Sequence, residues 1–172
     1  MWSDHIRTIP NFPKEGILFR DITPVFAHPH AFSGLISELS EHIGDATHIA
    51  GIEARGFIIG AALAQKVGLP FVAIRKAGKL PCETVSAAYE LEYGSATIEL
   101  DASALTKGDQ VLIVDDLLAT GGSALAAASL VEQLGASVSS VVCAIDLPTI
   151  GGSTRVREKG YAFAALVRFE GH

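Results

Sequence analysis

The chain has 172 residues, enough for one domain with a sizeable core, and its 49% hydrophobic and 19% charged residues exclude a disordered protein. Its net charge of −6 argues against nucleic-acid binding, and no apolar run approaches the roughly 18 residues of a membrane span. Two cysteines, Cys82 and Cys143, form no disulfide framework, and the N-terminus shows no apolar signal region. We therefore expect a single cytoplasmic domain over residues 1–172.

The N-terminal part combines irregular segments with one clear helix. Residues 1–12 predict a short helix followed by a loop through Pro10 and Pro13, and Pro13–Phe26 is also loop-like at its start. Pro29–Ile43 carries apolar residues at helical spacing, so we expect a helix that packs on a sheet.

Two charged residues lie among apolar neighbours within the second of these irregular segments. Arg20 and Asp21 follow the run Gly16–Phe19, which is unusual for a surface loop. Two interpretations remain open at this point. The two side chains form a local ion pair, or they border a binding pocket.

A first strand-loop-helix unit follows. His48–Ile52 predicts a short buried strand, Gly51–Phe57 (GIEARGF) a loop, and Phe57–Val67 a helix. Arg55 would lie at the start of this helix, near the strand ends, where a guanidinium can clamp phosphate. The alternative is that Arg55 only pairs with Glu53 in the same loop.

Positive charge is concentrated in one window of this acidic protein. From Ala54 to Cys82 there is no acidic residue, and the basic residues are Arg55, Lys66, Arg75, Lys76 and Lys79. Such a window can attract a small polyanion. The competing interpretation is a solvated basic surface.

The next segments predict a strand, an irregular loop and a hairpin. Phe71–Arg75 is a candidate buried strand, and Lys76–Ala87 shows no regular pattern, so we expect a mobile lid with Lys79 near its tip. Tyr89–Tyr93 and Ala96–Leu100 alternate like antiparallel strands around a two-residue turn at Gly94-Ser95.

The stretch Val111–Gly122 (VLIVDDLLATGG) is the centre of the chain. Four branched apolar residues predict a strand buried on both faces. Leu105–Asp109 leads into this strand, and Asp115 and Asp116 follow its apolar run. Ala124–Leu134 predicts a helix that directly follows a glycine-containing loop. Strand, acidic turn, loop and helix therefore succeed one another without spare residues.

That order favours a sugar-phosphate site. Backbone N–H groups at Thr120–Ser123 would point at one spot before the helix, which is how helix N-termini bind phosphate. Carboxylates only accept hydrogen bonds, so Asp115 and Asp116 suit sugar hydroxyls or a hydrated metal. The loop is no Walker A motif, because no lysine precedes Ser123. The alternative is a plain strand-turn-helix with surface aspartates.

The C-terminal part adds two strands and an uncertain helix. Ser137–Ile145 and Tyr161–Phe169 predict strands, and Thr149–Lys159 predicts a helix that Gly151 and Gly152 weaken. Strands that alternate with helices imply an α/β fold with a mainly parallel twisted sheet and a side hairpin. The six histidines show no zinc spacing.

The central stretch resembles the phosphoribosyl-pyrophosphate (PRPP) binding motif of the type I phosphoribosyltransferases. Four more stretches are similar, in the same order, to the adenine branch of that family: Phe12–Val25, Ala50–Phe57, Ile74–Pro81 and Tyr89–Gly94. The resemblance covers nearly the whole chain. It implies the type I phosphoribosyltransferase fold, with a small hood over about residues 1–30 and a flexible lid hairpin.

The resemblance also implies a reaction and its partners. The enzyme would act in purine salvage, transferring the 5-phosphoribosyl group from PRPP to adenine and giving AMP and pyrophosphate. Mg²⁺ is the implied cofactor; we expect it to arrive on PRPP near Asp115 and Asp116, without a dedicated protein cage. A homodimer is implied, with Arg75 and Lys76 as candidates to reach the partner's site.

The same resemblance assigns roles to individual residues. The 5′-phosphate would be held by Ala119, Thr120, Gly121, Gly122 and Ser123, and the ribose hydroxyls by Asp115 and Asp116. Pyrophosphate would contact Arg55, Arg75, Lys76 and Lys79. Adenine would contact Leu18, Phe19 and Arg20. Catalytic roles fall to Arg55 and to Glu92, which would serve adenine N7 with Tyr93 beside it. Ala54 stands where some relatives carry Ser, so this chain offers no side-chain hydroxyl there.

Two rival functions share parts of this pattern. A transferase for xanthine, hypoxanthine or guanine would differ in the hood, where Leu18 and Arg20 would face the base. A PRPP-binding regulator of transcription would need a DNA-binding extension, which an acidic chain without a basic recognition helix does not favour.

Overall fold

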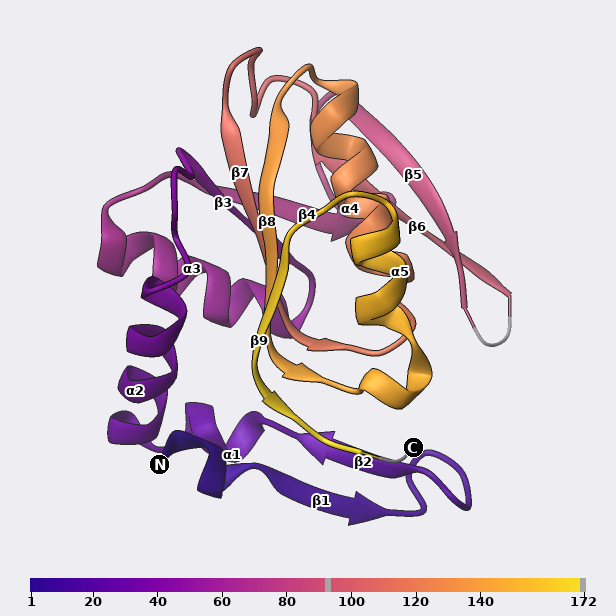
Figure 1. Cartoon of the computed structure of the whole chain (residues 1–172). Coiled ribbons are helices and arrows are strands. Elements are labelled where there is room, and N and C mark those ends of the chain that lie inside the picture. The colour runs from indigo at the N-terminus through magenta and orange to yellow at the C-terminus, as the bar shows by residue number, and fades with distance from the viewer. Residues whose placement is uncertain (92–93, 171–172) are drawn as a thin grey trace.

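The computed structural model describes residues 1–91 and 94–170, which form one large sheet, a small sheet and flanking helices (Figure 1). The strands are β1 (Arg7–Pro10), β2 (Leu18–Asp21), β3 (His48–Ile52), β4 (Phe71–Lys76), β5 (Thr84–Glu90), β6 (Ser95–Asp101), β7 (Gln110–Leu118), β8 (Ser137–Asp146) and β9 (Phe163–Arg168). The helices are α1 (Thr23–Phe26), α2 (Pro29–Ser40), α3 (Arg55–Val67), α4 (Gly122–Gln133) and α5 (Gly152–Glu158), with 3₁₀ turns η1 (Trp2–His5) and η2 (Pro148–Ile150). No helix in the described ranges is long and apolar enough to cross a membrane.

The large sheet has seven strands in the order β5-β6-β4-β3-β7-β8-β9. Five neighbouring strands of this sheet, β4, β3, β7, β8 and β9, pair in parallel, whereas β6 pairs antiparallel with β4 and with β5. This topology confirms the predicted α/β fold with a mainly parallel sheet and a side hairpin. Because parallel strands end at one edge, the residues that follow β3, β4 and β7 are brought together there.

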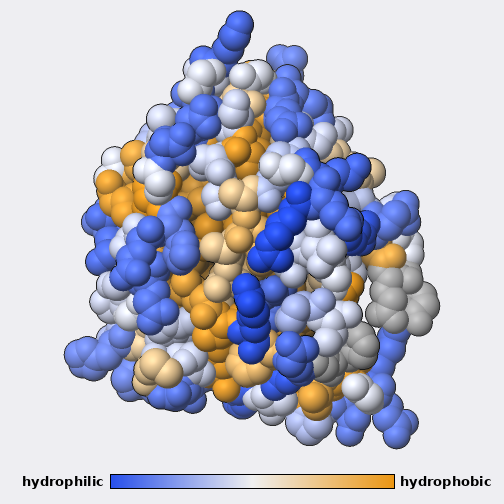
Figure 2. Space-filling model, viewed as in Figure 1, coloured by the Kyte–Doolittle hydropathy of each residue, from blue (hydrophilic) through white to orange (hydrophobic). Residues whose placement is uncertain are grey.

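Helices cover both faces of the sheet, α2 and α3 on one face and α4 and α5 on the other (Figure 1). The central strand β7 contributes to both cores, since Val111 and Ile113 pack in the cluster under α4 while Leu112 and Val114 pack in the cluster under α2 and α3. This double burial explains why its sequence is apolar without alternation. Apolar residues also gather over β8 and β9 in Figure 2, with hydrophilic residues on either side.

The small sheet lies below the carboxyl edge of the large sheet and corresponds to the predicted hood (Figure 1). Trp2 in η1 is buried, and its Nε1 donates to Glu38 of α2 at 2.8 Å, which anchors the N-terminal segment. The predicted short helix is therefore present as η1. The loop expected after it is wrong, because Arg7–Pro10 forms β1 and pairs antiparallel with β2.

Three other local predictions differ from the structure. The expected acidic turn after Val114 is strand, because β7 continues to Leu118 and pairs with β8 over these residues. The irregular segment is shorter than expected, since β5 begins at Thr84. Gly94-Ser95 is not a two-residue hairpin loop, because Ser95 already pairs with Glu90.

Candidate active site

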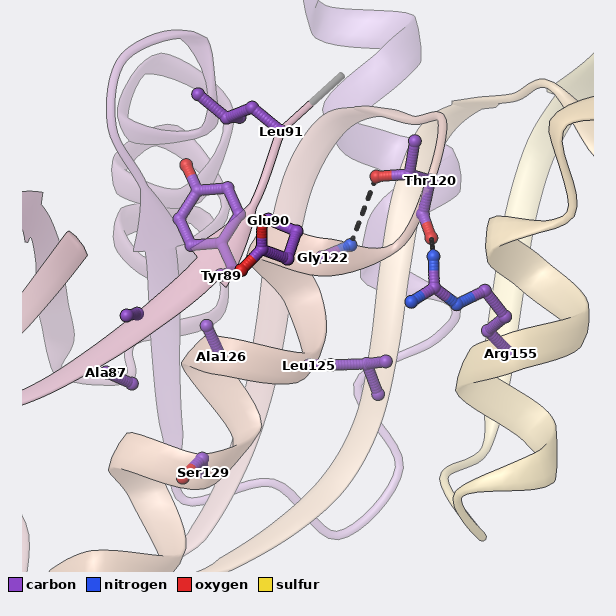
Figure 3. Close-up of a pocket in the computed structure, with 11 residues that line it drawn as sticks. Ala87, Tyr89, Glu90, Leu91, Thr120, Gly122, Leu125, Ala126, Ser129 and Arg155 are labelled. Carbon is purple, nitrogen blue, oxygen red and sulfur yellow. Dashed lines mark hydrogen bonds between the residues drawn. The ribbon is translucent and has the colours of Figure 1, made fainter. Parts of the chain in front are cut away.

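The segment Ala119–Ser123, which joins β7 to α4 and includes the first two residues of α4, is called the phosphate loop below. Gly121 precedes α4 with a φ of 80°, a conformation that favours glycine. The first bond of the helix runs from Leu125 N to Gly121 O at 3.0 Å, so the N–H groups of Gly122–Ala124 precede it. Among these, the Gly122 N–H donates to Thr120 Oγ1 at 3.4 Å (Figure 3). The loop thus presents backbone donors at a helix N-terminus, as an anion site requires.

The two aspartates lie just upstream, within the last part of β7. Asp116 is buried, and its Oδ2 accepts a hydrogen bond from Arg55 Nε at 2.5 Å. Asp115 is half-buried, and its Oδ1 accepts the Asp116 N–H at 2.9 Å. Burial and the adjacent Asp116 carboxylate raise the pKa of Asp115 well above its ordinary value. The pair therefore combines one firmly paired carboxylate with another whose charge a bound hydroxyl donor or cation would stabilise.

Arg55 begins α3, as the sequence predicted, but its partner is not the nearby glutamate. It pairs with Asp116, 61 residues away, rather than with Glu53. Its guanidinium carbon also lies 5.8 Å from the centre of the Phe19 ring. Arg55 therefore connects the aspartate pair to the hood strand β2.

Glu53 organises a second group of cations. Its carboxylate lies 3.2 Å from Arg75 NH2 and 3.8 Å from Lys79 Nζ, and it accepts the Lys76 N–H at 2.9 Å. The Lys76 N–H and the Arg75 guanidinium lower the pKa of Glu53. The peptide bond between Glu53 and Ala54 is cis. The predicted pyrophosphate residues thus form two groups: Arg55 pairs with Asp116, whereas Arg75 and Lys79 contact Glu53 with their side chains and Lys76 with its backbone N–H.

The candidate base-contacting residues lie on β2. Phe19 is half-buried and also meets the Phe12 ring edge-on, with centroids 5.2 Å apart. Leu18 is 36% exposed. Arg20 NH1 donates to Thr8 Oγ1 at 2.6 Å, and the Arg20 guanidinium carbon lies 4.5 Å from the Phe169 ring centre.

Of the two interpretations left open for Arg20 and Asp21, the local ion pair is wrong, because Asp21 pairs with Arg7 and Arg20 bonds to Thr8. Asp21 is buried and accepts from Arg7 NH2 at 2.6 Å, and from the backbone and hydroxyl of Thr23 at 2.9 and 2.6 Å. These bonds hold the end of β2, and with it the side chains that precede Asp21.

A pocket of about 490 Å³ adjoins the phosphate loop (Figure 3). It is lined by Ala87, Ala88, Tyr89, Glu90, Leu91, Thr120, Gly122, Leu125, Ala126, Ser129 and Arg155. The Tyr89 ring lies close to the loop, because a Cβ on Gly122 would be 3.1 Å from it, and burial and Asp115 raise the Tyr89 pKa. Glu92 and Tyr93, for which the family resemblance predicts roles at the adenine base, lie outside the described residues.

Sequence reasoning missed Tyr89 and Arg155 as neighbours of the loop. Arg155, on α5, donates from NH1 to the Thr120 carbonyl at 3.0 Å. A usable signal existed, since Gly151-Gly152 before α5 repeats the strand-Gly-Gly-helix pattern of Gly121-Gly122. On their own, the two glycines predict only a weakened helix.

The donor set suits a cation that arrives with its own oxygen ligands. Within residues 1–91 and 94–170, no group of three His, Cys, Asp or Glu side chains could hold a metal ion. Mg²⁺ is commonly held by one or two carboxylates together with substrate phosphates. Asp115 and Asp116 match that pattern, whereas a closed protein cage is not formed by the described residues.

Fold and site together define an α/β protein with a glycine-containing helix N-terminus and two aspartates at the carboxyl edge of its sheet. A family model described as "Phosphoribosyl transferase domain" matches residues 24–162. Adenine phosphoribosyltransferase of Pelodictyon phaeoclathratiforme is 52% identical over 170 residues, covering 96% of each chain. The chain therefore belongs to the phosphoribosyltransferase family, in its adenine branch.

Two solved structures of that branch have nearly the same fold. Adenine phosphoribosyltransferase of Thermoanaerobacter pseudethanolicus has a TM-score of 0.91 at 46% identity and covers 96% of both chains. The Saccharomyces cerevisiae enzyme, complexed with adenine and D-2,5-dideoxy-2,5-imino-altritol 1,6-bisphosphate, has a TM-score of 0.91 at 39% identity. It covers 96% of this chain and 98% of the yeast chain.

Proposed function

We infer that the protein transfers the 5-phosphoribosyl group from PRPP to adenine, giving AMP and pyrophosphate in purine salvage. One observation carries the assignment of the site: Asp115 and Asp116 lie on β7 just before the phosphate loop, and Asp116 is bonded to Arg55 at the start of α3. The phosphate loop, the aspartate pair and Arg55 would thus match, in this order, the 5′-phosphate, the ribose hydroxyls and the pyrophosphate of PRPP. Family membership and the full-length likeness to adenine enzymes select the base.

In this proposal the phosphoribosyl group lies along the end of β7. The backbone donors of the phosphate loop hold the 5′-phosphate, and Thr120 and Ser123 add hydroxyls. Asp115 and Asp116 accept the ribose hydroxyls. Burial and the neighbouring Asp116 carboxylate raise the pKa of Asp115, and hydroxyl donors or a cation would stabilise its charged form.

Cations take up the charge that pyrophosphate gains as it leaves C1′. Arg55 is closest to the aspartates, and Arg75, Lys76 and Lys79 supply the second group. Mg²⁺ on PRPP would neutralise part of the same charge, with Asp115 and Asp116 as the residues able to hold it, mainly through water. The developing sugar cation needs little covalent help, so positioning and charge placement supply most of the catalysis.

The base would stack against the hood. Phe19 offers a half-buried ring near Arg55, while the Leu18 backbone and Arg20 would fix the edge of adenine. Glu92 as the acid-base group for N7, with Tyr93 beside it, stays a proposal from the resemblance. Such a group can contribute about 10²–10⁴-fold to the rate.

The direct test follows AMP and pyrophosphate formation from adenine and PRPP, with and without Mg²⁺. Adenine should be converted, and Mg²⁺ should be required. Xanthine, hypoxanthine and guanine in the same competition should leave adenine as the preferred base. Preference for another purine would overturn the assignment of the base, and absence of AMP under all conditions would overturn the activity.

Lys79 offers a test of the pyrophosphate assignment. Lys79→Ala should raise the KM for PRPP and weaken pyrophosphate binding by several-fold, because a cation near Glu53 is lost, while adenine binding changes little. Lys66→Ala is the matched control, since Lys66 lies in the last turn of α3, roughly 16 Å along the helix from Arg55. Equal losses for pyrophosphate and adenine would argue against the assignment.

A homodimer and a cytoplasmic location complete the proposal. Cys82 is exposed and Cys143 buried, and both are free thiols, as a reducing compartment allows. Light scattering would give the oligomeric state. Mixing two inactive variants, one at Arg75 and one at Asp115, would restore activity only if Arg75 acts in the partner's site.

A further inference from the structure

Two successive carbonyls of the phosphate loop are bonded to the C-terminal segment that forms α5. The Ala119 carbonyl accepts the Gly152 N–H at 3.0 Å, and the Thr120 carbonyl accepts Arg155 NH1 at 3.0 Å. The first donor is backbone, whereas the second is a guanidinium that reaches across from α5 to the loop (Figure 3). Both bonds fix the direction in which these two carbonyl groups of the loop point.

The planar peptide unit converts these bonds into control of the opposite face. In a trans peptide the C=O of one residue and the N–H of the next point in opposite directions. Holding the Ala119 carbonyl toward the Gly152 N–H therefore turns the Thr120 N–H away from that donor. Holding the Thr120 carbonyl toward Arg155 likewise turns the Gly121 N–H away from the guanidinium. If either peptide rotated, a carbonyl oxygen would face the anion in place of a donor.

Arg155 is exposed, but the helix that carries it is held in place by a buried residue. The following residue, Val156, is fully buried in the core under α4, which fixes α5 against the sheet. The Arg155 backbone N–H also bonds to Gly151 O at 3.1 Å. Because the bond from Gly152 belongs to the backbone, Arg155 is the member of this pair that a substitution can remove.

We propose that Arg155 is a positioning residue of the phosphoribosyl site, which acts through the Thr120 carbonyl to aim the Gly121 N–H at the 5′-phosphate. The proposal rests on the proposed function, because it takes the loop to be the seat of that phosphate. Arg155 should therefore influence ligands that carry the 5′-phosphate and leave ligands without it unchanged.

The test compares binding of ribose 5-phosphate and of pyrophosphate by titration calorimetry, together with steady-state kinetics. Arg155→Ala should weaken ribose 5-phosphate and raise the KM for PRPP about tenfold, as expected for loss of a charged hydrogen bond. The affinity for pyrophosphate and the KM for adenine should stay unchanged. Arg155→Lys, which keeps a cationic donor, should recover most of the ribose 5-phosphate affinity.

Arg157→Ala is the matched control on the same helix. Arg157 stacks on the Phe163 ring at 5.0 Å instead of reaching the loop, so its loss should leave both ligands bound as in the unaltered protein. Equal weakening of ribose 5-phosphate and pyrophosphate, or no change in either, would overturn the role of Arg155. Calorimetry needs no turnover, so an unaltered protein that binds ribose 5-phosphate but makes no AMP would refute the activity while leaving this comparison decisive.

Discussion

The variant Asp115→Asn/Asp116→Asn should lose at least about 10³-fold in kcat/KM for PRPP while it keeps its fold. Each carboxylate accepts hydrogen bonds that an amide of the same shape accepts more weakly, and charge-assisted bonds of this kind contribute about 1.5–3 kcal/mol each. Thermal stability should not fall much, because the change removes the charge repulsion and the cost of burying a charged carboxylate, both of which raise the pKa of Asp115. The Arg55 side chain is 40% exposed and can be solvated without its partner.

Kinetics and thermal unfolding of the same preparation decide this. Asp45→Asn is the control, since Asp45 is exposed and precedes β3, at the opposite edge of the sheet from the site. It should leave both activity and unfolding temperature unchanged. A double variant with full activity would show that the aspartates do not hold the ribose, and one that fails to fold would show that they are structural.

The central motif could be predicted because its signals are local. An apolar run without alternation, two aspartates and two glycines before a helix need no knowledge of distant residues. The predicted strand is nevertheless too short, because residues 115–118 become strand through pairing with β8, where Asp115 pairs with Cys143 and Leu118 with Asp146. No pattern within residues 115–118 predicts that they pair with β8.

Charge pairs were the least predictable feature, because they depend on which strand ends meet. Arg20 and Asp21 are neighbours in sequence, yet a strand directs successive side chains to opposite faces, and Asp21 pairs with Arg7 instead. Arg55 likewise pairs with Asp116 and not with Glu53, which is closer in sequence. The resemblance implies the site residues, but the fold decides that Arg55 pairs with Asp116 whereas Arg75 and Lys79 pair with Glu53.

The second large effect is expected from Gly152→Ala. A Cβ on Gly152 would lie 2.2 Å from the Ala119 carbonyl oxygen and 2.7 Å from Gly121 N, and both atoms are backbone, so the phosphate loop itself must move. A displacement of about 1 Å at a substrate-positioning element can reduce the rate about 10²-fold, and overpacking of this kind typically costs about 1–3 kcal/mol of stability. We expect losses of that size in kcat/KM for PRPP and in the free energy of unfolding.

Gly34→Ala separates this close approach from a general glycine effect. A Cβ there would make ordinary contacts with Trp2 at 3.7 Å, and Gly34 lies inside α2, where alanine is the better helix former. It should leave activity unchanged and stability equal or higher. Ribose 5-phosphate binding is the sharpest measurement on Gly152→Ala, because the substituted residue is behind the loop and would not touch the ligand. If that affinity stayed at the unaltered value in a stably folded variant, the loop would not depend on its contact with α5 for the aim of its donors.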